Sequence, residues 1–133
     1  MPISSTVDHQ RRLITHTQTD PTTFEDMRAA IDRQWADQAW AYAVLWDARA
    51  LAAVPSMSDL GKLSVYINTF ASGHTRGPVG IFIAPSADTV RTGIEYVASS
   101  GRARDLEVLL NQGQADAWLA RHAIRRSDGA PPV

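Results

Sequence analysis

The pattern of apolar and polar positions begins with a period of two, which is typical of β-strands. It covers residues 3–7, and a second β-rich run covers residues 11–17. Residues 8–10 between the runs, Asp-His-Gln, are suited to a tight turn. The pattern therefore predicts a β-hairpin at the start of the chain.

After the hairpin, apolar residues recur at steps of three and four, and this spacing predicts an amphipathic helix that packs on a sheet. Its apolar positions are Phe24, Met27, Ala30, Ile31 and Trp35. A capping box fits in front of this helix in two registers, because a threonine hydroxyl accepts an early backbone N–H while an acid reaches back. The two registers are Thr22 with Glu25 and Thr23 with Asp26.

Two short apolar runs, residues 40–46 and 79–84, predict strands that are covered on both faces. Between them, Ser58 is the expected N-cap of a second helix. The expected buried stripe of that helix is Leu60, Leu63, Ile67 and Phe70.

The chain after the second apolar run predicts one more helix, a strand and a last helix. Ser86 is expected to cap the first of these helices, which should end at Gly101. Its inward positions are predicted to be Ala87, Val90, Ile94 and Val97. A short strand over residues 106–110 and a helix over residues 112–122 complete the pattern.

The predicted order is therefore β-β-α-β-α-β-α-β-α. Strands alternating with helices after a hairpin favour an α/β fold with a mostly parallel mixed sheet and four helices. We expect residues 1–124 to form a single domain, since 133 residues suit one domain. Residues 125–133, with arginines, glycine and two prolines, are expected to be a disordered tail.

Composition narrows the classes of function. The formal net charge of −1 argues against a nucleic-acid binder, which must neutralise phosphates. The absence of cysteine excludes disulfides and thiolate chemistry. The sequence has no signal-like amino terminus and no apolar run near the ~20 residues of a transmembrane segment. We therefore expect a bacterial-type cytoplasmic protein.

Four phrases occur in an order and spacing similar to the SpoIIAA-like family, which has the STAS fold and is sometimes grouped with SEC14-type lipid-binding domains. They are residues 44–49 (VLWDAR), 80–85 (GIFIAP), 92–96 (TGIEY) and 115–119 (ADAWL). The chain resembles this family over nearly its whole length, to about residue 124. The resemblance implies a STAS domain used for regulation or binding, without catalysis.

The resemblance also implies a candidate phosphorylation site. In members that act as anti-sigma factor antagonists, a partner kinase phosphorylates a serine at the start of the second helix, in the pattern Asp-Ser-Ser-Gly followed by Leu-Gly. Ser58 occupies that position here, and residues 60–61 agree. Ser56 and Asp59 depart from the pattern, and a phosphate beside Asp59 would meet a like charge.

Asp47 and Arg49 follow the first buried strand, at the carboxyl end where open α/β sheets place their ligands. Side chains two residues apart in an extended chain point the same way. We expect Asp47, Arg49, Ser58 and Asp59 to form the binding site. The alternatives are a structural ion pair for the first two and a plain N-cap for Ser58.

No catalytic residue, cofactor or metal site is predicted. The histidines lie in different predicted elements, and no pair has the i, i+4 spacing of a helical zinc site. They are His9, His16, His74 and His122. The chain lacks the Gly-x-Ser-x-Gly pattern of a nucleophile elbow. We therefore expect a protein that is not an enzyme.

The expected function is a non-catalytic regulatory module of STAS type that binds a partner protein. The alternative is a small-molecule or lipid-binding domain of SEC14-like type, which requires an apolar cavity between the helices and the sheet. Formation of a homo-oligomer is compatible with both.

Overall fold

The computed structural model describes residues 3–51, 55–70, 73–74, 76–84, 86–99 and 106–124. The strands are β1 (Ile3–Asp8), β2 (Leu13–Gln18), β3 (Ala43–Asp47), β4 (Val79–Phe82) and β5 (Leu106–Leu109). The helices are α1 (Phe24–Ala36), α2 (Met57–Phe70), α3 (Ala87–Ser99) and α4 (Gln112–His122). This order confirms the predicted α/β fold. The tail at 125–133 and the predicted helix end at Gly101 lie outside the described residues.

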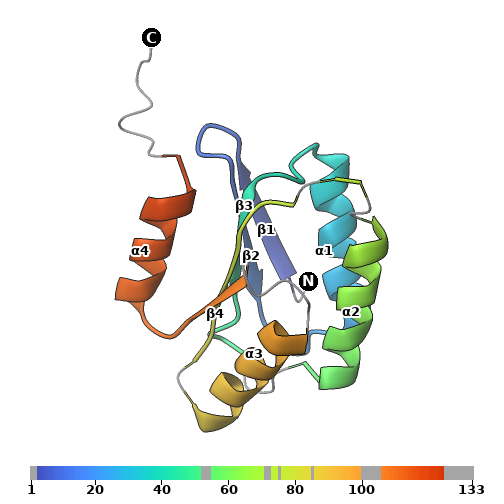
Figure 1. Ribbon diagram of the computed structural model, residues 1–133, viewed down its shortest axis with the longest axis vertical. Coiled ribbons are helices and arrows are strands. Elements are labelled where there is room, and N and C mark those ends of the chain that lie inside the picture. The colour runs from blue at the N-terminus through green and yellow to red at the C-terminus, as the bar shows by residue number, and fades with distance from the viewer. Residues whose placement is uncertain are drawn as a thin grey trace.

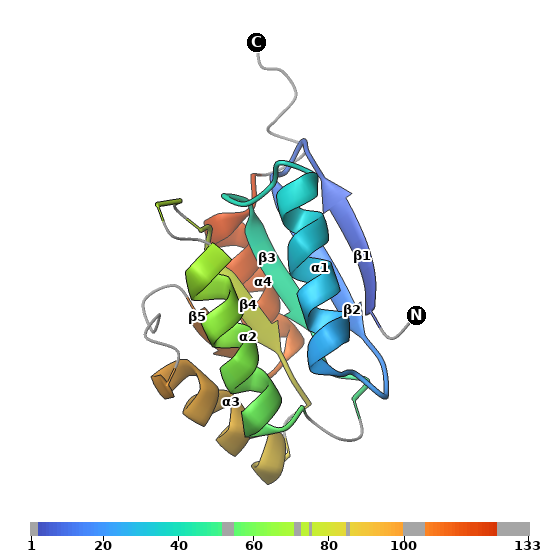
Figure 2. The same ribbon diagram turned by 90° about the vertical axis from the view of Figure 1, so that its right-hand side faces the viewer.

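The five strands lie in chain order, β1-β2-β3-β4-β5. β1 pairs antiparallel with β2, and the remaining pairs are parallel. Right-handed crossovers that advance in one direction across a sheet place their helices on one face. Accordingly, α1, α2 and α3 cover one face, and α4 lies on the other (Figure 1, Figure 2). None of the helices in the described part of the chain is long and apolar enough to cross a membrane.

The two apolar runs form adjacent inner strands, as predicted. Val44 of β3 pairs with Val79 of β4. Their side chains are almost completely buried, as are those of Phe82 and Ile14. Covering the inner strands on both faces removes a large apolar area from water, and this burial stabilises the domain.

The capping box of α1 uses the second predicted register. The Thr23 hydroxyl accepts the Asp26 backbone N–H at 3.3 Å, and the Asp26 carboxylate accepts the Thr23 N–H at 2.9 Å. The buried face of the helix contains Met27, Ala30, Ile31 and Gln34. Trp35, at the end of the predicted stripe, is 37% exposed.

β3 begins at Ala43, later than predicted. The backbone N–H of Tyr42 donates to the Ala39 carbonyl at 3.1 Å, so the chain before the strand is folded into a turn. The side-chain amide of Gln34 donates to the same carbonyl at 3.1 Å. Trp40 is still buried, because this turn packs against the end of α1. Apolar character predicted its burial but not its backbone conformation.

The buried face of α3 differs from the prediction at Ile94, which is 59% exposed. Gly93 and Tyr96 face the sheet instead. A Cβ atom at Gly93 would lie 3.3 Å from a methyl group of Val108, so the helix comes close to β5 there. The other inward positions whose side chains the structure describes are partly buried, namely Val90 and Val97. The predicted cap is confirmed, since the Ser86 hydroxyl accepts the backbone N–H of Thr89 at 3.3 Å.

α4 covers its face of the sheet by close contact with β4. A Cβ atom at Gly80 would lie 2.9 Å from the Trp118 ring and 3.0 Å from a methyl group of Leu109. Trp118 is 1% exposed, so its ring has no free space to move into. Glycine at position 80 therefore lets the helix lie against the sheet.

We predict that Gly80→Ala destabilises the protein by about 1–3 kcal/mol, because the added methyl overpacks the contact with Trp118. Gly61→Ala is the matched control, since a Cβ atom at Gly61 of α2 meets nothing within 4 Å. There the substitution should stabilise the helix by up to about 1 kcal/mol. Urea unfolding followed by circular dichroism measures both. Equal effects of the two substitutions would show that the contact is looser than described.

Candidate functional site

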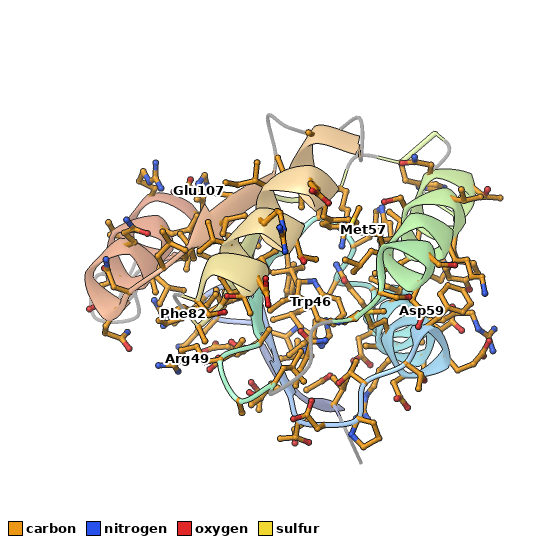
Figure 3. The ribbon with its side chains drawn as sticks, turned by 90° about the horizontal axis from the view of Figure 1, so that it is seen from below. Trp46, Arg49, Met57, Asp59, Phe82 and Glu107 are labelled. Carbon is orange, nitrogen blue, oxygen red and sulfur yellow. The ribbon has the colours of Figure 1, made fainter. Side chains whose placement is uncertain are left out.

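An apolar cavity of about 80 Å³ lies between the sheet and the three helices on its α1–α3 face. The sheet contributes Trp46, Val79 and Ile81 to its wall, and the helices contribute Leu63, Ile67 and Tyr96. Figure 3 shows Trp46 in the middle of the molecule, between α2 and the strands. The cavity therefore lies within the main core of the domain.

The composition of the wall explains why the space stays open. Large side chains from α2 and the sheet line it together with the small side chains of Ala48, Thr89 and Thr92. Protein interiors are normally packed without voids of this size. A cavity in the core is therefore a candidate for a ligand-binding site.

Two buried polar side chains line this cavity. Gln18, at the end of β2, is 4% exposed, and Arg76, just before β4, is 7% exposed. The guanidinium carbon of Arg76 lies 5.6 Å from the centre of the Trp40 ring. Polar side chains that are buried this deeply usually have a structural or functional partner.

His16 lies beside the cavity wall, on the strand next to Trp46. It is 1% exposed, its Nδ1 lies 2.7 Å from the Ser5 hydroxyl, and its ring centre is 4.2 Å from that of Trp46. Burial, and after it the positive charge of Arg76, lower the pKa of His16 to about 3. The imidazole is therefore neutral near pH 7. Its Nε2 has no hydrogen-bond partner in the described part of the chain.

Asp47 and Arg49 form an ion pair with each other at the end of β3. The guanidinium donates to the two carboxylate oxygens at 2.9 and 2.7 Å. These bonds hold the pKa of Asp47 below its usual value. The Arg49 guanidinium carbon also lies 4.1 Å from the centre of the Phe82 ring. The two side chains point the same way, as expected, but Ala48 between them is the residue that lines the cavity.

Ser58 does not cap α2, so that prediction is wrong. The helix begins at Met57, and the Ser56 hydroxyl accepts the backbone N–H of Asp59 at 3.0 Å. Ser56 therefore satisfies the free N–H group that the prediction assigned to Ser58. Ser58 is exposed in the first turn, and Asp59 is partly exposed.

The four predicted site residues fall into two groups. Figure 3 shows Arg49 beside Phe82 and shows Asp59 far from them, across Trp46. The strand order also never reverses, so the sheet lacks the switch point at which open α/β sheets form a crevice. The pairing of Asp47 with Arg49 agrees with the alternative of a structural ion pair.

Sequence reasoning missed Gln18 and Arg76. The predicted second strand ends at residue 17, although Gln18 is the last residue of β2 and lies on the same face as Ile14 and His16. Extending the two-residue alternation by one more position would have placed a polar side chain on the buried face. Arg76 lies in an irregular segment between α2 and β4, where periodicity carries no signal.

Within the described residues, His, Asp and Glu side chains do not gather in groups of three or more that could hold a metal ion. No family model matches the chain, and no curated protein or solved structure matches it. The α/β fold is thus shown by the structure, while the resemblance to the SpoIIAA-like family stays a prediction.

We predict that His16 makes the stability depend on pH. Its pKa is about 3 in the folded protein and about 6.5 in the unfolded chain, so between these values the unfolded chain binds the extra proton. Stability should therefore fall as the pH falls, by about 1.4 kcal/mol between pH 7.5 and 5.5. Urea unfolding at both pH values measures the loss, and His16→Gln should remove it. The same pH dependence in both proteins would contradict the assignment to His16.

Proposed function

We propose that this chain is a binding domain for a small, largely apolar ligand, held in the cavity between the sheet and α1–α3. The observation that carries the proposal is the cavity itself, with its volume of about 80 Å³ and its mostly apolar wall. Ligand sites in proteins are concave and apolar, with a few polar groups that orient the ligand. Gln18 and Arg76 are such groups in this wall.

The volume limits the size of the ligand. A cavity of about 150 Å³ holds benzene, or roughly 25 Å³ for each carbon. By that measure, 80 Å³ holds an aliphatic group of about three or four carbons. The acyl chain of a membrane lipid needs several times this volume. We therefore propose a small molecule and not a lipid as the ligand.

Filling the cavity should abolish binding. The Leu63 side chain lines it, and Leu63→Phe adds carbon atoms that the open space can accommodate. We expect butan-1-ol, used as a probe, to shift the amide NMR signals of cavity residues in a saturable way. In Leu63→Phe its affinity should fall at least about tenfold, because displacing roughly two buried CH₂ groups costs more than 1.4 kcal/mol.

Val65→Phe is the matched control, with a similar enlargement on the same helix at a side chain that is 67% exposed. It should bind butan-1-ol as the wild-type protein does. Shifts that do not saturate, or equal affinity in the two variants, would contradict binding in the cavity.

A regulatory protein-binding module of STAS type is the second candidate. It is favoured by the exposure of Ser58 in the first turn of α2, next to Met57, which is 38% exposed. The partial positive charge at a helix N-terminus favours a phosphate there. A partner protein would then dock on this end of α2.

We expect a partner of that kind to distinguish Ser58→Asp from the wild-type protein, because the added charge lies within the docking surface. Quantitative affinity capture from cell extract measures this. Ile94→Asp is the control, since it adds the same charge at an exposed position of α3. A partner that the wild type and Ile94→Asp retain, and Ser58→Asp retains at least about tenfold less, agrees with the proposal. Equal retention by all three proteins contradicts it.

A further inference from the structure

We infer that the ligand of the cavity is a short aliphatic carboxylate, whose chain lies among the apolar side chains and whose carboxylate is bound by Arg76. This inference rests on the proposed binding function and adds the charge of the ligand to it. Four observations carry it: the charge of the wall, the donors of Arg76, the side chain of Gln18 and the volume.

The charge of the wall has one sign. Among the described residues that line the cavity, Arg76 is the one charged side chain, and none is acidic. Its positive charge reaches at least as far as His16, whose pKa it helps to lower. A buried anion is stabilised by such a charge, whereas a buried cation is repelled by it.

Arg76 is held in a position suited to binding. It is 7% exposed, so its guanidinium has already lost most of its hydration, and a ligand would cause little further loss. The chain is fixed beside it, because a Cβ atom at Gly77 would lie 2.2 Å from the Tyr42 carbonyl oxygen. A guanidinium has five N–H donors, and it can therefore bind a carboxylate through two of them and keep its protein contacts.

Gln18 shows that the cavity is suited to a ligand with polar atoms. The residue is 4% exposed, and its side chain lines the cavity. Its side-chain amide carries N–H donors and a carbonyl acceptor. A polar group of the ligand would form hydrogen bonds with them, and such bonds would orient the ligand in the cavity.

The volume and the charge together define the class of ligand. The space suits about three or four aliphatic carbons. A carboxylate of this length places its apolar carbons against the wall and its charge on Arg76. Butyrate is therefore the probe that fits both features, because its three-carbon chain fills about 75 Å³ by the same measure and its carboxylate lies at Arg76. Butan-1-ol and butylammonium have the same number of carbon atoms with a neutral and a positive end.

The experiment is an NMR titration of the wild-type protein with these probes at pH 7.5 and constant ionic strength. We expect butyrate to bind at least about tenfold more tightly than butan-1-ol, since a hydrogen bond between two charged groups is stronger than one to a neutral hydroxyl. Butylammonium should bind most weakly. Arg76→Met should lose the preference for butyrate and keep the affinity for butan-1-ol.

Arg76→Lys serves as a second variant, because it keeps the positive charge and should still prefer butyrate to butylammonium. If Arg76→Met does not fold, the order of the probes on the wild-type protein remains decisive. If butan-1-ol binds as tightly as butyrate, the inference that the ligand is a carboxylate is overturned, and the proposed function still stands. Failure of every probe to bind would overturn the proposed function, and this inference with it.

Discussion

The structure depends on the burial of β3 and β4 on both faces of the sheet. Val44 is 0% exposed and Phe82 is 3% exposed, although they face opposite sides. The strands follow one another in chain order, so right-handed crossovers place α1, α2 and α3 on the same face. The opposite face then depends on α4, the helix that follows the last strand (Figure 1).

This unequal cover explains the different packing of the two faces. A single helix must lie close to the sheet to bury it, and Gly80 allows the Trp118 ring to do so. On the other face, α3 approaches β5 at Gly93, while the large side chains of Leu63 and Ile67 lie between α2 and the strands. The cavity lies among these side chains.

The buried polar side chains on the α1–α3 face of the sheet form two groups, according to whether they line the cavity. Gln34 donates to two carbonyl groups and fixes the turn before β3, and His16 is held by Ser5. These contacts offset part of the cost of desolvation, although His16 Nε2 and Gln34 Oε1 have no hydrogen-bond partner among the described residues. Gln18 and Arg76 instead line the cavity. Under the proposed function, these two side chains are the polar groups that the ligand would contact.

The sequence by itself determined the order of elements, the two inner strands and the boundaries of α4, since these follow from local periodicity and turn residues. It also identified candidate caps, although Ser56 and Ser58 are both serines and local chemistry could not separate them. Only the tertiary structure decided that Asp47 pairs with Arg49, and that Gln18 and Arg76 share one cavity. The physical reason is that a cavity is formed by side chains far apart in the chain, whose distances depend on how the helices pack on the sheet.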